Sequence, residues 1–125
     1  MTVPLLDLQA QYTPLRQAIL DAVTRVCDSQ RFIGGPEVEG LERELCESLD
    51  VPHAIGLSSG TDAVLAALMA LDIGPGDEVI TPTYSFFATA GCVMRAGARP
   101  VLVDVEPGTF NIDVDATQAA ITPRT

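Results

Sequence analysis

Apolar residues recur at helical spacing in two stretches near the start of the chain. In PLRQAILDAVTRVCDSQ, residues 14–30, apolar positions lie three and four residues apart, which predicts an amphipathic helix with Pro14 in its first turn. Gly34, Gly35 and Pro36 then force a turn, and the apolar positions over 38–49 mark a second helix with a polar face. The pattern therefore predicts a helical region over residues 1–50.

After Val51 the pattern changes to short apolar runs separated by helical stretches. We expect strands at 54–58, 77–82 and 99–105. An alanine- and leucine-rich helix follows the first strand through Leu71, a second helix covers 84–98, and a short one ends at Ile121. This alternation predicts an α/β fold, in which ligands gather where strands end. The strand-to-helix junctions 58–61 (SSGT) and 81–87 (TPTYSFF) are the candidate ligand-binding loops.

Composition adds constraints on partners and location. The chain has 125 residues and 47% apolar composition, which fits one soluble domain with one core. Seven basic residues face 17 acidic ones, and the net charge of -10 argues against nucleic acid or an anionic membrane as a partner. The N-terminus lacks a basic, apolar leader pattern, and no apolar run reaches membrane-spanning length, so we expect a cytoplasmic protein.

The cysteines and the basic residues limit the kinds of metal, redox and lysine-dependent sites that this chain could form. Cys27, Cys46 and Cys92 lack the paired spacings of zinc or redox sites, so we expect reduced structural thiols and no metal site. All seven basic residues are arginines, which leaves no lysine in the chain. This polypeptide therefore supplies no ε-amine for a Schiff base and no lysine for a Walker-type phosphate loop.

The first junction has the features of an anion site. Ser58, Ser59, Gly60 and Thr61 combine hydroxyl donors with a glycine that lets the backbone approach a ligand, at the start of a helix. The same residues also fit an ordinary helix cap, with Asp62 stabilising the positive end of the helix dipole. Local pattern alone leaves both interpretations open.

The second junction is aromatic. Tyr84, Phe86 and Phe87 follow directly on the strand predicted over 77–82, in a chain with six aromatic residues. Such rings either fill the core or stack on a planar ligand at the edge of the sheet. A phosphate-binding turn beside a stacking ring would suit a phosphorylated aromatic cofactor.

Taken together, several blocks resemble the N-terminal part of the DegT/DnrJ/StrS family of pyridoxal-phosphate-dependent sugar aminotransferases. They keep the order and approximate spacing of the family across the whole chain. The blocks are LLDLQAQY from Leu5, FIGGPEVEGLERELCESL from Phe32, IGLSSGTDAVLAAL from Ile55, DEVITPTYSFFATAGCVMRAGARPVLVDV from Asp77, and FNID at 110–113.

The resemblance implies part of a fold-type I aminotransferase large domain: an incomplete, mixed but mostly parallel sheet flanked by helices. Residues 1–50 would form N-terminal helices, and 51–125 a strand-helix-strand core with the cofactor-phosphate turn. Ser59, Gly60 and Thr61 match that turn, and Phe86 matches the ring that stacks on the pyridine of pyridoxal 5'-phosphate. Gly35 lies in a segment that runs near the active site in this family.

The resemblance also implies a function for a longer parent protein. That enzyme would be a homodimer that transfers an amino group, commonly from glutamate, to a nucleotide-linked keto-sugar. The lysine that anchors the cofactor has no counterpart in this chain, so we assign no catalytic residue and expect residues 1–125 alone to be inactive. The chain stops where an α/β fold would enter its next strand, so we expect it to be part of a larger fold.

Other functions remain open at this point. Some relatives in the family are sugar dehydratases with histidine in place of the lysine, but the only histidine here, His53, precedes the first predicted strand. A truncated, non-catalytic protein is a further alternative. A dinucleotide-binding domain is disfavoured, because SSGTDA lacks the G-x-G-x-x-G pattern.

Overall fold

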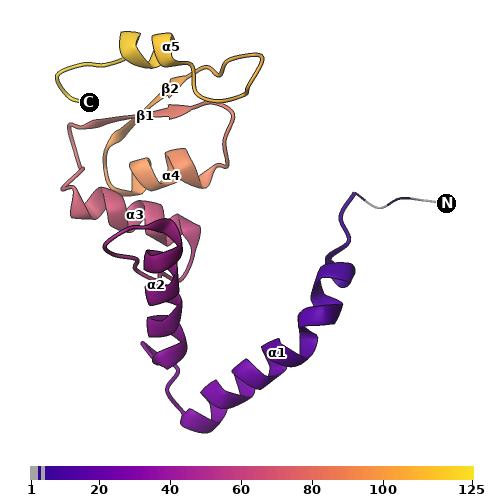
Figure 1. Ribbon diagram of the computed structural model, residues 1–125. Helices are drawn as coiled ribbons and strands as arrows, with labels where there is room; N and C mark the ends of the chain where they lie inside the picture. Colours follow the sequence, from indigo (N-terminus) through magenta and orange to yellow (C-terminus); the bar gives the residue numbers. More distant parts are fainter. Residues whose placement is uncertain (1–2, 4) are drawn as a thin grey trace. The chain divides into compact units, whose positions relative to one another are not determined.

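The computed structural model describes residue 3 and residues 5–125, which form two compact units (Figure 1). The first unit ends at Gly56 and the second covers 57–125. In the described part of the chain, no helix combines the length and apolar character needed to cross a membrane.

The described part of the first unit contains two helices, of which α1 (Leu8–Ser29) starts earlier than the sequence pattern predicted. Asp7 caps it, because its carboxylate accepts a 2.9 Å hydrogen bond from the Ala10 N–H. Pro14 therefore lies inside the helix, and the prediction that it occupies the first turn is wrong. Proline has no N–H, so α1 lacks the hydrogen bond that residue 14 would otherwise donate to the Ala10 carbonyl.

Helix α2 (Pro36–Leu49) confirms the second predicted helix. Gly35 is the N-cap, and Pro36 takes the first helical position, where its missing N–H costs nothing. Gly34 has a φ of +57°, a conformation that favours glycine and produces the predicted turn. At the other end Asp50 adopts the left-handed conformation with φ 52°, and the helix stops there.

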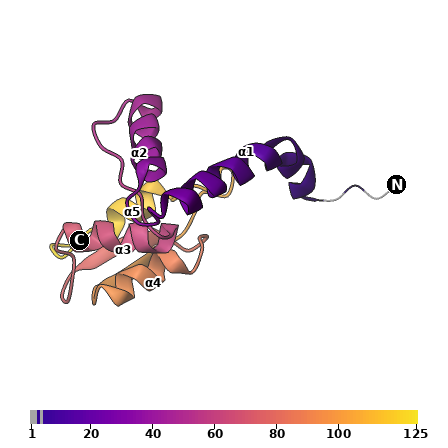
Figure 2. The ribbon, with the colours of Figure 1, turned by 90° about the horizontal axis from the view of Figure 1, so that it is seen from below.

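The second unit is a small α/β arrangement built around two parallel strands. Its elements are α3 (Gly60–Ala70), β1 (Glu78–Pro82), α4 (Ala88–Arg95), β2 (Arg99–Val103) and α5 (Val114–Ala119). Strand β1 pairs with β2 so that Glu78 lies opposite Arg99 and Pro82 opposite Val103. Helix α4 packs against both strands and against α3, and Figure 2 shows α3 and α4 side by side. Helix α5 lies on the other side of the strands from α4 (Figure 1).

The strand predicted over residues 54–58 does not form, which corrects the sequence-based expectation. A strand is defined by its ladder of hydrogen bonds to a neighbour. Within the described residues β1 and β2 pair only with each other, so the segment 54–58 has no partner strand. Its Gly56 N–H instead donates a 2.7 Å hydrogen bond to the Glu42 carboxylate.

The other predicted strands form, with shifted boundaries. The Thr83 N–H still donates to the Val103 carbonyl at 2.9 Å, so the chain leaves the sheet only after residue 83. Helix α4 consequently begins at Ala88, and the prediction of a helix from Tyr84 is wrong for residues 84–87. Strand β2 ends at Val103 rather than at 105, because Val105 forms an isolated antiparallel bridge with Ile112.

The core of the second unit lies between α4 and the strands. It consists of the buried residues Cys92, Val93, Ala98 and Val103. Thr81 on β1 is 4% exposed, and its hydroxyl is the one buried side-chain oxygen without a hydrogen-bond partner among the described residues. A buried hydroxyl without a partner loses its hydrogen bonds to water without replacement.

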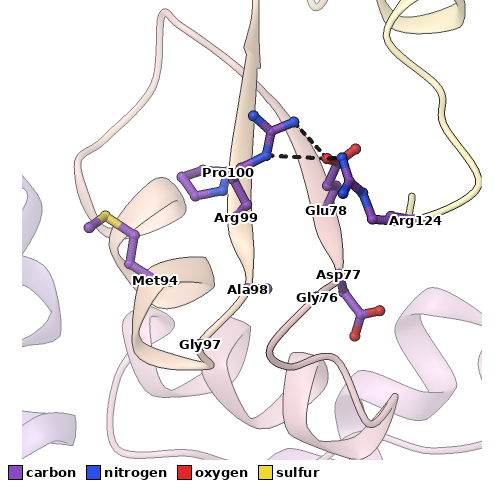
Figure 3. Close-up of a pocket in the computed structure, with 9 residues that line it drawn as sticks. All are labelled: Gly76, Asp77, Glu78, Met94, Gly97, Ala98, Arg99, Pro100 and Arg124. Carbon is purple, nitrogen blue, oxygen red and sulfur yellow. Dashed lines mark hydrogen bonds and ion pairs between the residues drawn. The ribbon is translucent and has the colours of Figure 1, made fainter.

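Glu78, at the start of β1, accepts hydrogen bonds from three side chains. The hydroxyl of Thr122 donates at 2.6 Å, the Arg99 Nη2 at 2.6 Å and the Arg124 Nη2 at 2.8 Å. Glu78, Arg99 and Arg124 line an open hollow of about 450 Å³, drawn in Figure 3, at the amino ends of both strands. The hollow therefore lies at the opposite edge from the carboxyl-end loop that carries Phe86. Hydrogen bonds from Thr122 and then Arg99 hold the pKa of Glu78 below its ordinary value.

We expect Thr81→Val to stabilise the protein. Valine has nearly the same shape and suits a strand, and it removes the unpaired buried hydroxyl, so the gain should be about 1 kcal/mol. Thermal unfolding followed by circular dichroism measures the effect. Thr83→Val, at an exposed position, is the matched control and should change the melting temperature little. A lower melting temperature for Thr81→Val would contradict this explanation.

We expect Glu78→Gln to lower the melting temperature at neutral pH, because glutamine cannot accept the charge-assisted bonds from both arginines. The folded-state pKa of Glu78 is depressed, so its stabilisation is present above the ordinary pKa and disappears as the pH falls through the lower folded value. The difference in melting temperature between wild type and Glu78→Gln should therefore shrink in acid. A difference that stays constant with pH would count against an ionised Glu78.

Candidate functional site

The turn that begins α3 has the geometry of an anion-binding helix start. Ser59 is in an extended conformation, and its hydroxyl oxygen accepts a 3.1 Å hydrogen bond from the Asp62 N–H. The N–H groups of Gly60 and Thr61 lie in the first turn, where no carbonyl inside the helix can accept from them. A Cβ added at Gly60 would meet no atom within 4 Å, so open space surrounds this backbone.

The Asp62 carboxylate holds the two serine hydroxyls beside this turn. Ser58 donates at 2.5 Å and Ser59 at 3.1 Å to the same oxygen. These bonds, that of Ser58 first, lower the pKa of Asp62. Both hydroxyl protons are therefore committed, and the donors that remain for an anion are the N–H groups of Gly60 and Thr61. The Thr61 hydroxyl also has no hydrogen bond to another described residue.

The aromatic loop after β1 is exposed rather than packed in the core. Tyr84, Phe86 and Phe87 are all more than two-thirds exposed, so the core-filling interpretation of these rings does not hold here. The Tyr84 ring lies 5.8 Å from that of Phe110, centroid to centroid, and a Cβ on Gly91 would lie 3.3 Å from the Phe87 ring. Phe86 remains with 78% of its surface exposed.

A buried thiol connects the two helices that carry these features. Cys92 of α4 donates a 3.2 Å hydrogen bond to the Thr61 carbonyl in the first turn of α3. Phe86 lies just before α4. The turn at Ser59–Thr61 and the aromatic loop therefore lie at the starts of two helices, α3 and α4, that contact each other.

Two residues singled out by the sequence lie in the first unit. His53 is exposed in the loop after α2. Gly35 is buried, and a Cβ there would lie 2.6 Å from the Arg31 carbonyl oxygen, so glycine is needed for local packing. In the described part of the chain no three histidine, cysteine, aspartate or glutamate side chains gather as metal ligands.

Sequence reasoning missed two contacts at this site. The pattern Ser59-Gly60-Thr61-Asp62 matches a capping box, and its fourth position could have indicated that Asp62 bonds back to the serines. The contact between Cys92 and Thr61 joins residues 31 positions apart, and no local pattern indicates it.

Comparison with known proteins shows which family the chain matches. Residues 14–125 match the model of the DegT/DnrJ/EryC1/StrS aminotransferase family. A curated relative from Geobacillus stearothermophilus, called a pleiotropic regulatory protein, is 48% identical over the whole chain, which covers 34% of that protein. A UDP-N-acetyl-3-dehydro-alpha-D-glucosamine 3-aminotransferase from Acidithiobacillus ferrooxidans is 46% identical over 98% of this chain and 33% of its own length.

A solved structure agrees with the fold. The crystal structure of NtdA from Bacillus subtilis with bound cofactor PMP is 41% identical and has a TM-score of 0.92 over 99% of this chain and 29% of its own. The expected fold, part of a pyridoxal-phosphate-dependent aminotransferase large domain, is therefore confirmed. The chain spans about a third of the length of the curated relatives it matches. The family match over nearly all of the sequence, with these relatives, shows that the chain belongs to the DegT/DnrJ/EryC1/StrS aminotransferase family.

Proposed function

We propose that residues 1–125 are the cofactor-binding N-terminal part of an aminotransferase that uses pyridoxal 5'-phosphate. The parent enzyme would be a cytoplasmic homodimer that transfers an amino group from glutamate to a nucleotide-linked keto-sugar. Residues 1–50 would supply N-terminal helices and 51–125 the core with the phosphate turn. The observation that carries the proposal is the start of α3, where free backbone donors face open space in a member of an aminotransferase family.

The residues at this turn fit the phosphate of such a cofactor. The N–H groups of Gly60 and Thr61 would donate to phosphate oxygens at the positive end of the helix dipole. Ser59 would fix the turn through its cap on the Asp62 N–H rather than by donating its own proton. The exposed Phe86 ring would stack on the pyridine, a contact available to a flat aromatic ligand.

The work of this chain would be to bind and orient the cofactor. When bound, pyridoxal phosphate supplies a reactive carbonyl on an electron-withdrawing ring, which accepts and passes on the amino group. The turn would hold the phosphate end, and Phe86 would set the plane of the ring. No group of this chain is assigned to move a proton at the substrate carbon, because the chain contains no lysine.

The substrate class rests on the relatives. The Acidithiobacillus ferrooxidans protein is named for an amino transfer at carbon 3 of a UDP-linked sugar, and a 45% identical relative from Streptomyces venezuelae is called a dTDP-3-amino-3,4,6-trideoxy-alpha-D-glucose transaminase. The sugars differ between these two proteins, while a nucleotide-linked sugar is common to both names. That shared feature supports a nucleotide-linked keto-sugar as the substrate of the parent enzyme.

We expect Gly60→Ala to weaken cofactor binding without unfolding the protein. The added methyl group meets no protein atom within 4 Å, and alanine suits a helix better than glycine, but the methyl group would occupy space that the phosphate needs. A suitable probe is 4'-deoxypyridoxine 5'-phosphate, which lacks the aldehyde and forms no adduct with amines. Its affinity, followed by the amide NMR signals of residues 59–62, should fall by about tenfold or more.

Gly108→Ala is the matched control for this experiment. Gly108 also has no atom within 4 Å of an added Cβ and lies in a loop of the same unit. We expect this variant to bind the probe as tightly as wild type. Equal binding by Gly60→Ala, or no binding of the probe by wild type, would refute the proposed site.

The contacts of the Asp62 carboxylate predict how the pKa of this group changes when one of the two serines is replaced. Because Ser58 makes the leading contribution to the lowered pKa of Asp62, Ser58→Ala should raise that pKa more than Ser59→Ala does. The carboxyl 13C signal of Asp62, followed by NMR as the pH is lowered, gives the pKa in each variant. A larger rise in Ser59→Ala would show that the turn is held differently from this description.

A further inference from the structure

We infer that Cys92 is a positioning residue for the cofactor: its thiol holds the phosphate turn at a fixed place relative to the loop that carries Phe86. The inference rests on the proposed function and adds a residue that lies outside the turn and the ring. The role proposed for Cys92 is to fix the distance between the phosphate turn and the Phe86 ring, which one cofactor molecule would have to contact at the same time.

The first step is the contact between Cys92 and the turn. The Cys92 side chain is completely buried, and its Sγ lies 3.2 Å from the Thr61 carbonyl oxygen. A thiol is a weak donor, so this bond contributes little energy by itself. It nevertheless joins α4 to the residue whose N–H and hydroxyl would face the phosphate.

The second step is the connection from α4 back to the aromatic loop. The carbonyl of Phe86 accepts from the Thr89 N–H at 3.0 Å, and that of Phe87 accepts from the Gly91 N–H at 3.0 Å. The hydroxyls of Ser85 and Thr89 lie 2.9 Å apart and share a hydrogen bond. The aromatic loop is therefore bound to the first turn of α4.

These contacts form one continuous path between the two candidate binding features. Cys92 lies four residues after Ala88, which begins α4, a distance of roughly 6 Å along the helix axis. The path runs from the Thr61 carbonyl to the Cys92 thiol, along this stretch of α4, and then through the bonds from Thr89 to the Phe86 carbonyl. A shift of α4 against the start of α3 would change the separation of the phosphate site and the ring.

The consequence differs between ligands. Inorganic phosphate needs only the turn, so its binding does not depend on where Phe86 lies. A ligand with both a phosphate and a pyridine ring has to satisfy both contacts at once, and its affinity depends on how well their separation is fixed beforehand. The ratio of the two affinities therefore reports on positioning, whereas a general loss of stability affects both ligands alike.

The experiment compares Cys92→Ala with Cys92→Ser, because serine keeps a donor at this position and alanine does not. Affinities for 4'-deoxypyridoxine 5'-phosphate and for inorganic phosphate are measured by amide NMR shifts. Cys92→Ala should bind the pyridine phosphate about two- to threefold more weakly, the low end of the range for one net hydrogen bond because a thiol is a weak donor, with no measurable change for phosphate. Cys92→Ser should restore the ratio to near that of wild type.

Val93→Ala is the matched control. Val93 is the next residue of α4 and is 2% exposed, but its side chain carries no donor for Thr61. It should lower the melting temperature and leave the affinity ratio unchanged. If Cys92→Ala fails to fold, Cys92→Val fills the space without a donor and should show the same altered ratio.

The outcomes separate this inference from the proposed function. If wild type binds the pyridine phosphate and Cys92→Ala keeps the wild-type ratio, the positioning role of Cys92 is refuted and the proposed function stands. The same holds if Val93→Ala changes the ratio as much as Cys92→Ala does. If wild type binds neither ligand, the proposed function fails and the inference fails with it.

Discussion

The parallel pairing of β1 and β2 is the constraint on which the second unit depends. Parallel neighbours cannot be joined by a tight turn, so the chain has to return across the sheet between Pro82 and Arg99. Helix α4 makes that return and covers one face of the strands, while its entry loop places Phe86 at their carboxyl ends. At the amino ends the Glu78 carboxylate binds Arg99 of the neighbouring strand, which holds the pair together at that edge.

An anion bound at the turn before α3 would rely on short-range donors, because the net charge of the protein has the same sign as that of a phosphate. A net charge of -10 opposes the approach of a phosphate, and Asp62 adds a carboxylate beside the turn. Two arginines, Arg99 and Arg124, are committed to Glu78 at the other end of the strands. Arg95 makes only the smallest contribution to the lowered pKa of Asp62. Recognition of an anion at Gly60 and Thr61 would therefore depend mainly on the oriented N–H groups, whose effect is strong only at contact distance.

The sequence pattern predicted the helices and strands that are determined by neighbouring residues in the chain. Helix α2 follows from its glycine turn and Pro36, and the strands β1 and β2 follow from short apolar runs with β-branched residues. The segment 54–58 has the same kind of run but finds no neighbour among the described residues, and pairing is not a local property. Helix α1 starts at Leu8, after the Asp7 cap, and so contains Pro14. A cap contributes about 1 kcal/mol and an interior proline costs about 3 kcal/mol, so the cap alone does not account for this early start. At the candidate site, the capping pattern of Ser59 was readable, whereas the contact of Cys92 with Thr61 required the packing of two helices.

The complete burial of Cys92 also makes it a built-in reporter of motion. A thiol reagent cannot reach this sulfur in the closed state, so its alkylation has to wait until α3 and α4 separate. Cys27, by contrast, is exposed and reacts from the native state. When closing is faster than labelling, the slow rate at Cys92 divided by the rate of an unhindered thiol gives the equilibrium constant for local opening. The residue that connects the two helices therefore records how often they come apart.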